Sequence, residues 1–416
     1  MPTTLAEVLR RFGPAVLAQR HAEGRELAPV QARAWAAITQ CRTPALGGQL
    51  LRCDGCQAEQ WRWHACRNRH CPQCQTRQRE AWRRARGAEL LNVPYCHLVF
   101  TLPHELNPLA AARPRWLYDT LLDTVASTLT TFAADPKWLG GTGAFTLVLH
   151  TWAQDLSRHL HVHVLMACGA LSSDGQGQPH WQTPRRSPTF LFPVRALSQV
   201  WRARFIDTLV QAQSSPRPCV DATGRPMPLP LQALCTKPWV VYAKTPLAGP
   251  AAVLDYLSRY THRTAIGNER LLGIHGDQVR FRTRVNRKHA AADAAARATT
   301  ATNQPRSRVT QLPGPVFIER LLQHVVPRGF KRIRHYGLLA PAAKRSRLAC
   351  ARALLGMPAV HPEVSEDVAQ FMRRVAAVDI QTCAHCGQGR WHAVACQAPE
   401  QAMPVHNLTH APRGPP

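Results

Sequence analysis

Two short cysteine pairs, Cys53–Cys56 and Cys71–Cys74, constrain this chain more than any other feature. The two residues between the members of each pair, and the 14 residues between the pairs, are typical of zinc knuckles. A segment this short cannot bury enough apolar surface to fold alone, whereas four thiolates at this spacing close a tetrahedral metal site. We therefore predict a structural zinc site made by Cys53, Cys56, Cys71 and Cys74, with no open position for catalysis.

Further cysteine and histidine residues accompany these pairs. Seven of the 14 cysteines lie between Cys41 and Cys96, and the first residues do not resemble an export signal, so metal binding is favoured over disulfides. Spare residues that complete a second site, replace one of the four thiolates or simply pack are Cys41, His64, Cys66 and His70. A half-site, Cys383 and Cys386, follows near the C-terminus. It belongs either to an unliganded tail or to a zinc knuckle completed from Cys396, His385 and His392.

The charge balance indicates a polyanionic partner. The chain has 52 Lys and Arg against 25 Asp and Glu, a formal net charge of +27, and nearly all of the positive charge is Arg. Arginine donates two hydrogen bonds to a phosphate, and a positive field of this size attracts nucleic acid. A GC-rich genome explains the preference for Arg over Lys but not the shortage of acids. We expect DNA as the partner, bound more weakly as the salt concentration rises.

The hydrophobic pattern gives no sign of a membrane segment. No run of about 18 apolar residues is present, so we expect no transmembrane helix. Near the N-terminus, Leu5, Val8, Leu9 and Phe12 recur at helical spacing and predict a surface helix. The expected location is the bacterial cytoplasm, at the nucleoid when the protein is bound to DNA.

The segment from His159 to Leu165 alternates polar and apolar residues. On a strand, His159, His161 and His163 share one face, while the intervening residues point into a core. Two imidazoles at this spacing can bind one divalent cation, Mg²⁺ or Mn²⁺, that polarises a scissile phosphate. The pair His161 and His163 leads the long apolar half of the strand and is favoured, with His159 as the alternative member. The third ligand is open among His150, Gln154, Asp155, His159 and His262.

Two tyrosines provide candidate nucleophiles. Tyr256 and Tyr260 lie four residues apart and share one face of a predicted helix, interleaved with Arg259 and Arg263. A phenol with a pKa near about 10 needs cationic help to attack phosphorus, and arginine can neutralise the phosphate oxygens. A pair at this spacing is also typical of ordinary amphipathic packing. The histidine strand is what favours catalysis.

Arginines also surround the cysteine pairs. We predict that the cysteine-rich module recognises DNA through some of these side chains, with Arg67 and Arg69 as the principal phosphate contacts. The other members of the group are Arg62, Arg77 and Arg79.

Several long motifs, in this order, closely resemble the insertion-sequence ninety-one family, the two-tyrosine rolling-circle transposases of the HUH class. The resemblance covers about residues 30 to 340. Its motifs are CRNRHCPQCQ, PYCHLVFTLPHELN, LHTWAQDLSRHLHVHVL, WVVYAKTPLAGPAAVLDYLSRYTHRTAIGNERLL and FIERLLQHVVPRGFKRIRHYG. Two stretches depart from the family pattern: Met-Ala-Cys-Gly-Ala after the histidine strand, where relatives have a more Gly-rich turn, and the basic region from Arg282 to Pro313.

The resemblance implies a fold and a reaction. It implies an α/β (α+β) fold of the HUH endonuclease type, in which helices flank an antiparallel central sheet and a zinc-binding domain precedes it. His161 and His163 would be the HUH pair, and Tyr256 and Tyr260 the nucleophiles. One tyrosine would attack a single strand at an element end, leaving a 5′-phosphotyrosine and a free 3′-OH, and the second would support strand transfer. The implied function is DNA transposition without ATP.

The predicted organisation has four parts. A helical segment (1–45) precedes the zinc-binding DNA-recognition domain (46–95). The catalytic domain (96–345) contains a flexible basic insertion (282–313), and a C-terminal tail with a half-site for zinc follows (346–416).

Three other functions share some of these features. A rolling-circle replication initiator or relaxase would use the same histidines and tyrosines, but a zinc module ahead of the histidine strand favours a transposase. The run from Arg332 to Tyr336 suggests a tyrosine recombinase, which would act without metal. An inactive transposase relic would bind DNA in a zinc-dependent manner and form no covalent adduct.

Overall fold

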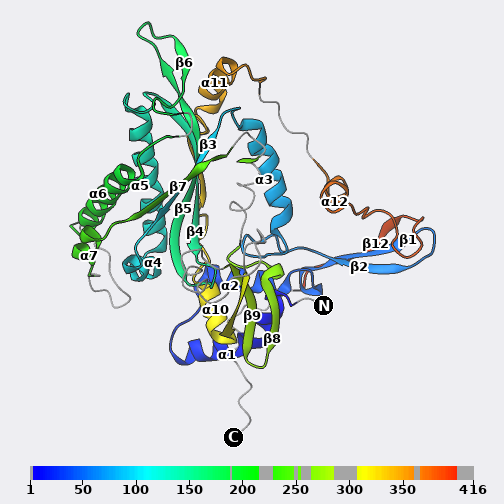
Figure 1. Ribbon diagram of the computed structural model, residues 1–416. Helices are drawn as coiled ribbons and strands as arrows, with labels where there is room; N and C mark the ends of the chain where they lie inside the picture. The colour runs from blue at the N-terminus through cyan, green and yellow to red at the C-terminus, as the bar shows by residue number, and fades with distance from the viewer. Residues whose placement is uncertain are drawn as a thin grey trace, which may run out of the picture.

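The computed structural model describes residues 3–187, 190–214, 228–247, 252–253, 264–284, 307–359 and 366–400. These residues form a sheet domain, a second core of helices and a three-stranded sheet, and a projecting arm (Figure 1). Within these ranges, no helix combines the length and the apolar character needed to span a bilayer.

The sheet domain has an antiparallel central sheet, which confirms the predicted fold class. Its strands run in the order β11–β4–β5–β3–β7, with β6 paired to the far end of β5, and every pairing is antiparallel. The strands are β3 (Tyr95–Thr101), β4 (Thr142–Trp152), β5 (Arg158–Ser173), β6 (Pro179–Gln182), β7 (Val240–Leu247) and β11 (Ile333–Gly337). In Figure 1 one side of the sheet faces α4 (Asn107–Ala112), α5 (Pro114–Ala134), α6 (Val194–Gln213) and α7 (Leu231–Thr236), and the other side faces α3 (Gln75–Glu89).

Strand alternation gives this sheet one face that packs on the main core and another, which we call the polar face, that carries the histidines beside the apolar Tyr95 and Leu165. Val162 and Val164 of β5 are fully buried and belong to the main core, together with Leu121 and Val125 of α5 and Trp201 of α6. Burying an aliphatic side chain of this size stabilises the fold by roughly 1.5–3 kcal/mol. Because the histidines of β5 alternate with these residues, they point to the opposite face.

A close approach at the sheet edge depends on glycine. Gly337, the last residue of β11, has φ +60, and a Cβ there would lie 1.8 Å from the carbonyl oxygen of Gly143 on β4. The same carbonyl accepts a hydrogen bond from the Leu338 amide at 2.9 Å. Any side chain at position 337 would push β11 away from β4.

The second core joins the N-terminal helices to the segment from Leu271 to Leu322. It contains α1 (Leu5–Ala22), α2 (Pro29–Gln40), β8 (Leu271–His275), β9 (Gln278–Arg284), β10 (Ser307–Pro313) and α10 (Gly314–Leu322). A capping box of Thr4 and Glu7 begins α1, and Arg20 pairs with Glu319 of α10 at 2.8 Å. Residues 285–306 of the predicted basic insertion lie outside the described residues. The two ends of that insertion are strands, not a loop, because alternate residues of β9 face this core.

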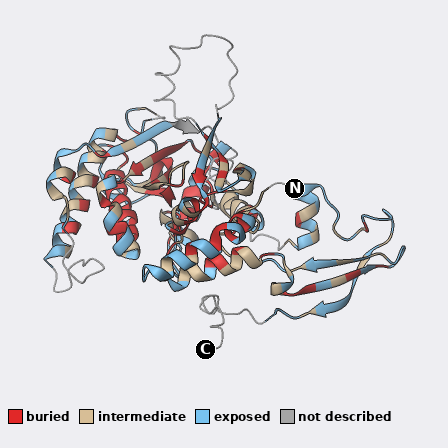
Figure 2. Cartoon of the chain, turned by 90° about the horizontal axis from the view of Figure 1, so that it is seen from below, coloured by how far each residue is buried: buried red, intermediate tan, exposed pale blue. Residues whose placement is uncertain are grey.

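The arm is a three-stranded sheet in the order β12–β1–β2. It consists of β1 (Gly48–Cys53), β2 (Glu59–Trp63) and β12 (Trp391–Gln397), with α12 (Val368–Ala376) beside it in Figure 1. Between α12 and the sheet domain, α11 (Ala349–Leu354) packs near α3. Figure 2 shows that the arm is mostly exposed or partly buried. Part of the predicted C-terminal tail is therefore an edge strand of the N-terminal module.

Candidate metal centres

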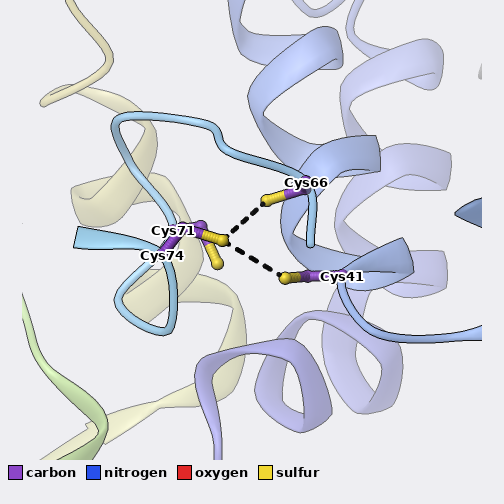
Figure 3. A group of neighbouring side chains, drawn as sticks. All are labelled: Cys41, Cys66, Cys71 and Cys74. Carbon is purple, nitrogen blue, oxygen red and sulfur yellow. Dashed lines mark hydrogen bonds between the residues drawn. The ribbon is translucent and has the colours of Figure 1, made fainter. Parts of the chain in front are cut away.

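Four cysteines meet where the second core joins the cysteine-rich module. Cys41 follows α2, while Cys66, Cys71 and Cys74 lie between β2 and α3, and their four Sγ atoms lie within 4.8 Å of one another (Figure 3). The Sγ atom of Cys74 is 3.5 Å from that of Cys41 and 3.6 Å from that of Cys66. A tetrahedral zinc site with Zn–S bonds of about 2.3 Å needs sulfurs about 3.8 Å apart, so these side chains fit zinc.

The surrounding chain holds these four thiols in place. Cys71 is 1% exposed and belongs to the second core, so the site is embedded in packed apolar residues. Arg42 and Arg67, each directly after a cysteine of the group, have φ angles of 58 and 53. These left-handed turns reverse the chain after Cys41 and Cys66 and turn both sulfurs toward Cys74. With all four positions filled by sulfur, the site is structural.

The predicted grouping of cysteines is wrong. Cys53 and Cys56 do not join Cys71 and Cys74, because the β1–β2 hairpin carries them to the other end of the arm. They lie instead beside two cysteines from near the C-terminus. The spare residues Cys41 and Cys66 complete the first group.

His70 is not a member of either cysteine group. Its Nε2 atom is buried without a hydrogen-bond partner among the described residues, and burial lowers the pKa of this imidazole to about 3. It lines a cavity with Trp35, Ile38 and His324 in the second core. His70 is therefore a neutral packed side chain.

Three histidines form a third group on the polar face of the central sheet. His161 and His163 of β5 lie with His150 of β4, and their ligand nitrogens are within 4.8 Å of one another. His150 pairs directly with His161 across the two strands, so the antiparallel register brings these rings together. Among the candidates for a third ligand, the structure thus brings in His150. His159 lies outside the group, with its ring 5.3 Å from that of His104.

The hydrogen bonds of these rings suit metal binding. Nδ1 of His161 lies 3.0 Å from the carbonyl oxygen of His159, so Nδ1–H donates and Nε2 keeps a lone pair. Nδ1 of His163 lies 3.0 Å from Nε2 of His97, a residue of β3 that is 2% exposed. Burial lowers the pKa of His161 to about 4 and that of His97 to about 3, which keeps both rings neutral at pH 7. Neutral imidazole is the form that binds a metal.

Known proteins share most of the length of this chain. The family described as "Putative transposase" matches residues 143–347, and the one described as "Transposase zinc-binding domain" matches residues 8–102. A relative named "Putative transposase y4qJ", from Sinorhizobium fredii (strain NBRC 101917 / NGR234), is 37% identical over 395 residues, 93% of each chain. The chain belongs to the insertion-sequence ninety-one family of transposases. The transposase for insertion sequence element IS801 from Pseudomonas savastanoi pv. phaseolicola is 27% identical over 363 residues, 83% of this chain and 79% of that relative.

This transposase therefore has the family membership that its motifs predicted. The zinc-binding match contains Cys41, Cys66, Cys71 and Cys74, and the cluster of these four supports a structural zinc ion. The second match contains all three histidines of the polar face. DNA is the partner that membership of a transposase family implies.

Not every predicted site residue of this transposase falls within the described part of the chain. Residues outside it are Tyr256, Tyr260, Arg259, Arg263 and His262. Of the two arginines predicted to contact DNA beside the cysteine pairs, Arg67 is exposed. Arg69 donates a hydrogen bond to the carbonyl oxygen of Phe330 at 2.7 Å, which ties it to the protein.

His97 is the residue that sequence reasoning missed. Its neighbours Cys96 and Leu98 are buried in the main core, and this alternation alone would have directed His97 toward the other face. What the sequence does not reveal is that β3 pairs with β5 in the register that sets His97 beside His163.

Proposed function

We propose that this transposase cuts one strand of DNA by attack of Tyr256 or Tyr260 on phosphorus, as an HUH single-strand endonuclease with strand-transfer activity. The phenol oxygen forms a bond to phosphorus while the bond to the 3′ oxygen breaks, giving a 5′-phosphotyrosine and a free 3′-OH. The phenol loses one proton and the leaving 3′ oxygen gains one. Transfer to a second 3′-OH reverses these steps, so the free energy of the phosphodiester is conserved.

The observation that carries the proposal is the group of His150, His161 and His163. These convergent imidazoles fit a divalent cation, and Mg²⁺ or Mn²⁺ bound there would neutralise charge on the non-bridging phosphate oxygens. His97 contacts Nδ1 of His163, which orients that ring and leaves Nε2 for the ligand. Strand pairing of β4 with β5 fixes the relative positions of these three residues.

A second observation supports the choice of tyrosines. Val253 lies three residues before Tyr256 and is fully buried in the same apolar cluster as Tyr95 and Leu165. Tyr95 lies two residues from His97 on β3, and Leu165 lies two residues from His163 on β5. Both therefore occupy the same face of the sheet as these histidines. The segment that leads to the tyrosines thus begins on the histidine face.

The test uses labelled single strands from the element ends with Mg²⁺ or Mn²⁺. We expect a covalent protein–DNA adduct that survives SDS and does not form in EDTA. Tyr256→Phe and Tyr260→Phe would each reduce adduct formation, and the double variant would abolish it. Tyr242→Phe is a matched control, because Tyr242 is an exposed tyrosine on the neighbouring strand β7.

Two outcomes would count against the proposal. An adduct that persists in the double variant would exclude these tyrosines as nucleophiles. Binding of authentic ends without any adduct, in the presence of either metal, would indicate a DNA-binding protein that does not cut.

A further inference from the structure

We propose that Cys53, Cys56, Cys383 and Cys386 hold a second structural zinc ion, which fastens the C-terminal region to the N-terminal module. All four Sγ atoms lie within 4.8 Å of one another. The Sγ atoms of Cys53 and Cys386 are 3.8 Å apart, and those of Cys56 and Cys383 are 3.7 Å apart. These separations match the value of about 3.8 Å for a tetrahedral zinc–thiolate site. The family match for zinc binding ends at residue 102, far before Cys383.

The two cysteine pairs adopt the same turn. Gln57 and Gly387, the residues directly after each pair, have φ angles of 56 and 70. The Gln57 amide donates to the carbonyl oxygen of Cys53 at 3.1 Å, and the Gly387 amide donates to that of Cys383 at 2.9 Å. Each turn brings the two sulfurs of its pair to one side. Two matched turns with facing sulfurs are the arrangement that a zinc knuckle needs.

Gly389 makes the approach of the two pairs feasible. A Cβ at this position would lie 2.4 Å from Sγ of Cys53, so no other residue fits without displacing a cysteine. The Gly389 amide donates to Sγ of Cys386 at 3.3 Å, and its carbonyl accepts from the Cys383 amide at 2.7 Å. An N–H aimed at sulfur favours the thiolate over the thiol, which is the form that binds zinc.

A carboxylate aligns the two segments. Oδ1 of Asp54, inside the first pair, accepts from the Arg390 amide at 2.7 Å, and the Asp54 amide donates to the Arg390 carbonyl at 3.1 Å. Oδ2 of Asp54 lies 3.1 Å from Nε2 of His392. His392 is thereby engaged by a carboxylate and does not complete the site.

Neither a disulfide nor apolar packing accounts for this group. A disulfide needs sulfurs about 2.05 Å apart, well below the separations seen here. None of the hydrophobic clusters formed by the described residues contains these four cysteines, although Cys53 and Cys383 are 0% and 1% exposed. Most side chains of β2 and β12 are exposed. A small sheet with so little core needs the folding free energy that zinc supplies.

Metal content tests which cysteines share an ion. The full-length protein should contain two zinc ions per chain. Cys53→Ser/Cys56→Ser, Cys383→Ser/Cys386→Ser and the quadruple variant should each contain one, because both pairs serve the same ion. Cys396→Ser, an exposed cysteine on β12, should keep two. Two ions in the Cys383→Ser/Cys386→Ser variant, or iron in place of zinc in the wild type, would overturn the proposal.

Alkylation of the wild-type protein tests the site without any variant. Cys56, Cys386 and Cys396 are all exposed, so accessibility alone would let iodoacetamide react with each of them. We expect Cys56 and Cys386 to react at least tenfold more slowly than Cys396 until a chelator removes zinc, and then at a similar rate. Equal rates before chelation would contradict zinc binding here.

Discussion

His97 sets the orientation of one histidine in the proposed catalytic group. It contacts Nδ1 of His163 at 3.0 Å, and such outer partners typically change metal affinity by about 10- to 100-fold when they are removed. We expect His97→Ala to raise the Mn²⁺ concentration for half-maximal adduct formation by that factor, while the maximal rate at saturating Mn²⁺ recovers. His104→Ala, at an exposed histidine nearby, is the control. Loss of the maximal rate with unchanged Mn²⁺ dependence would exclude this positioning role.

Arg67 and Arg69 differ in what they can offer to DNA. Arg67 is exposed, whereas Arg69 donates to the Phe330 carbonyl and burial lowers its pKa. We expect Arg67→Ala to weaken DNA binding at every sequence and to reduce the slope of log affinity against log salt by about 1. Arg69→Ala should lower the melting temperature and leave that slope unchanged. If Arg69→Ala reduced the slope of log affinity against log salt more than Arg67→Ala does, Arg69 and not Arg67 would be the phosphate contact.

The C-terminal end of α3 depends on one buried arginine. Arg352 of α11 is 6% exposed and donates to the carbonyl oxygens of Ala88, Leu90 and Pro358 at 2.8–3.0 Å. Its removal leaves the buried Leu90 carbonyl and the half-buried Ala88 carbonyl without this partner, at about 1–3 kcal/mol for a buried group. We expect Arg352→Ala to reduce the free energy of unfolding by about 3 kcal/mol in urea, and Arg352→Lys to restore only part of it.

Arg345→Ala is the control for this prediction. Arg345 is exposed on the short π-helix (Lys344–Leu348) that precedes α11, and its loss should change the free energy of unfolding by less than about 0.5 kcal/mol. Equal effects of the two alanine variants would show that the hydrogen bonds of the Arg352 guanidinium do not stabilise the end of α3.

Elements with a local pattern could be predicted, and their partners could not. Alternation along β5 defines its two faces, so His161 and His163 could be identified from the sequence alone. His150 and His97 reach the same group only through the register of β4 and β3 against β5, which depends on how the whole sheet packs. The cysteine pairs show the same limit. The spacing of Cys53 and Cys71 fits one site as well as two, and only the pairing of β12 with β1 separates them.

At the scale of the whole molecule, distant parts of the chain complete each other. α1 packs against α10, β12 extends the sheet that β1 begins, and Arg84 of α3 pairs with Glu366 at 2.9 Å. With the hydrogen bond from Arg69 to the carbonyl of Phe330 in the main core, these contacts couple the zinc-binding module directly to the sheet domain and to the C-terminal region. A change that destabilises one of them should therefore also lower the stability of the others.

Acid should destabilise the whole fold through its buried neutral histidines. Burial lowers the pKa of His324 to about 4, and its two nitrogens contact Thr151 Oγ1 and the Leu156 carbonyl, as suits one donor and one acceptor. In the unfolded chain its pKa is about 6.5, so the unfolded state takes up the proton first. The stability that His324 contributes is complete above about pH 6.5 and falls as the pH drops toward 4. Relative to wild type, His324→Gln should lose about 1 kcal/mol less of its free energy of unfolding in urea between pH 7.5 and 5.5. The zinc-binding thiolates titrate in the same way in both proteins, so their effect cancels in this comparison. Parallel pH profiles of the two proteins would show that His324 is charged in the folded state or does not contribute to the pH dependence of stability.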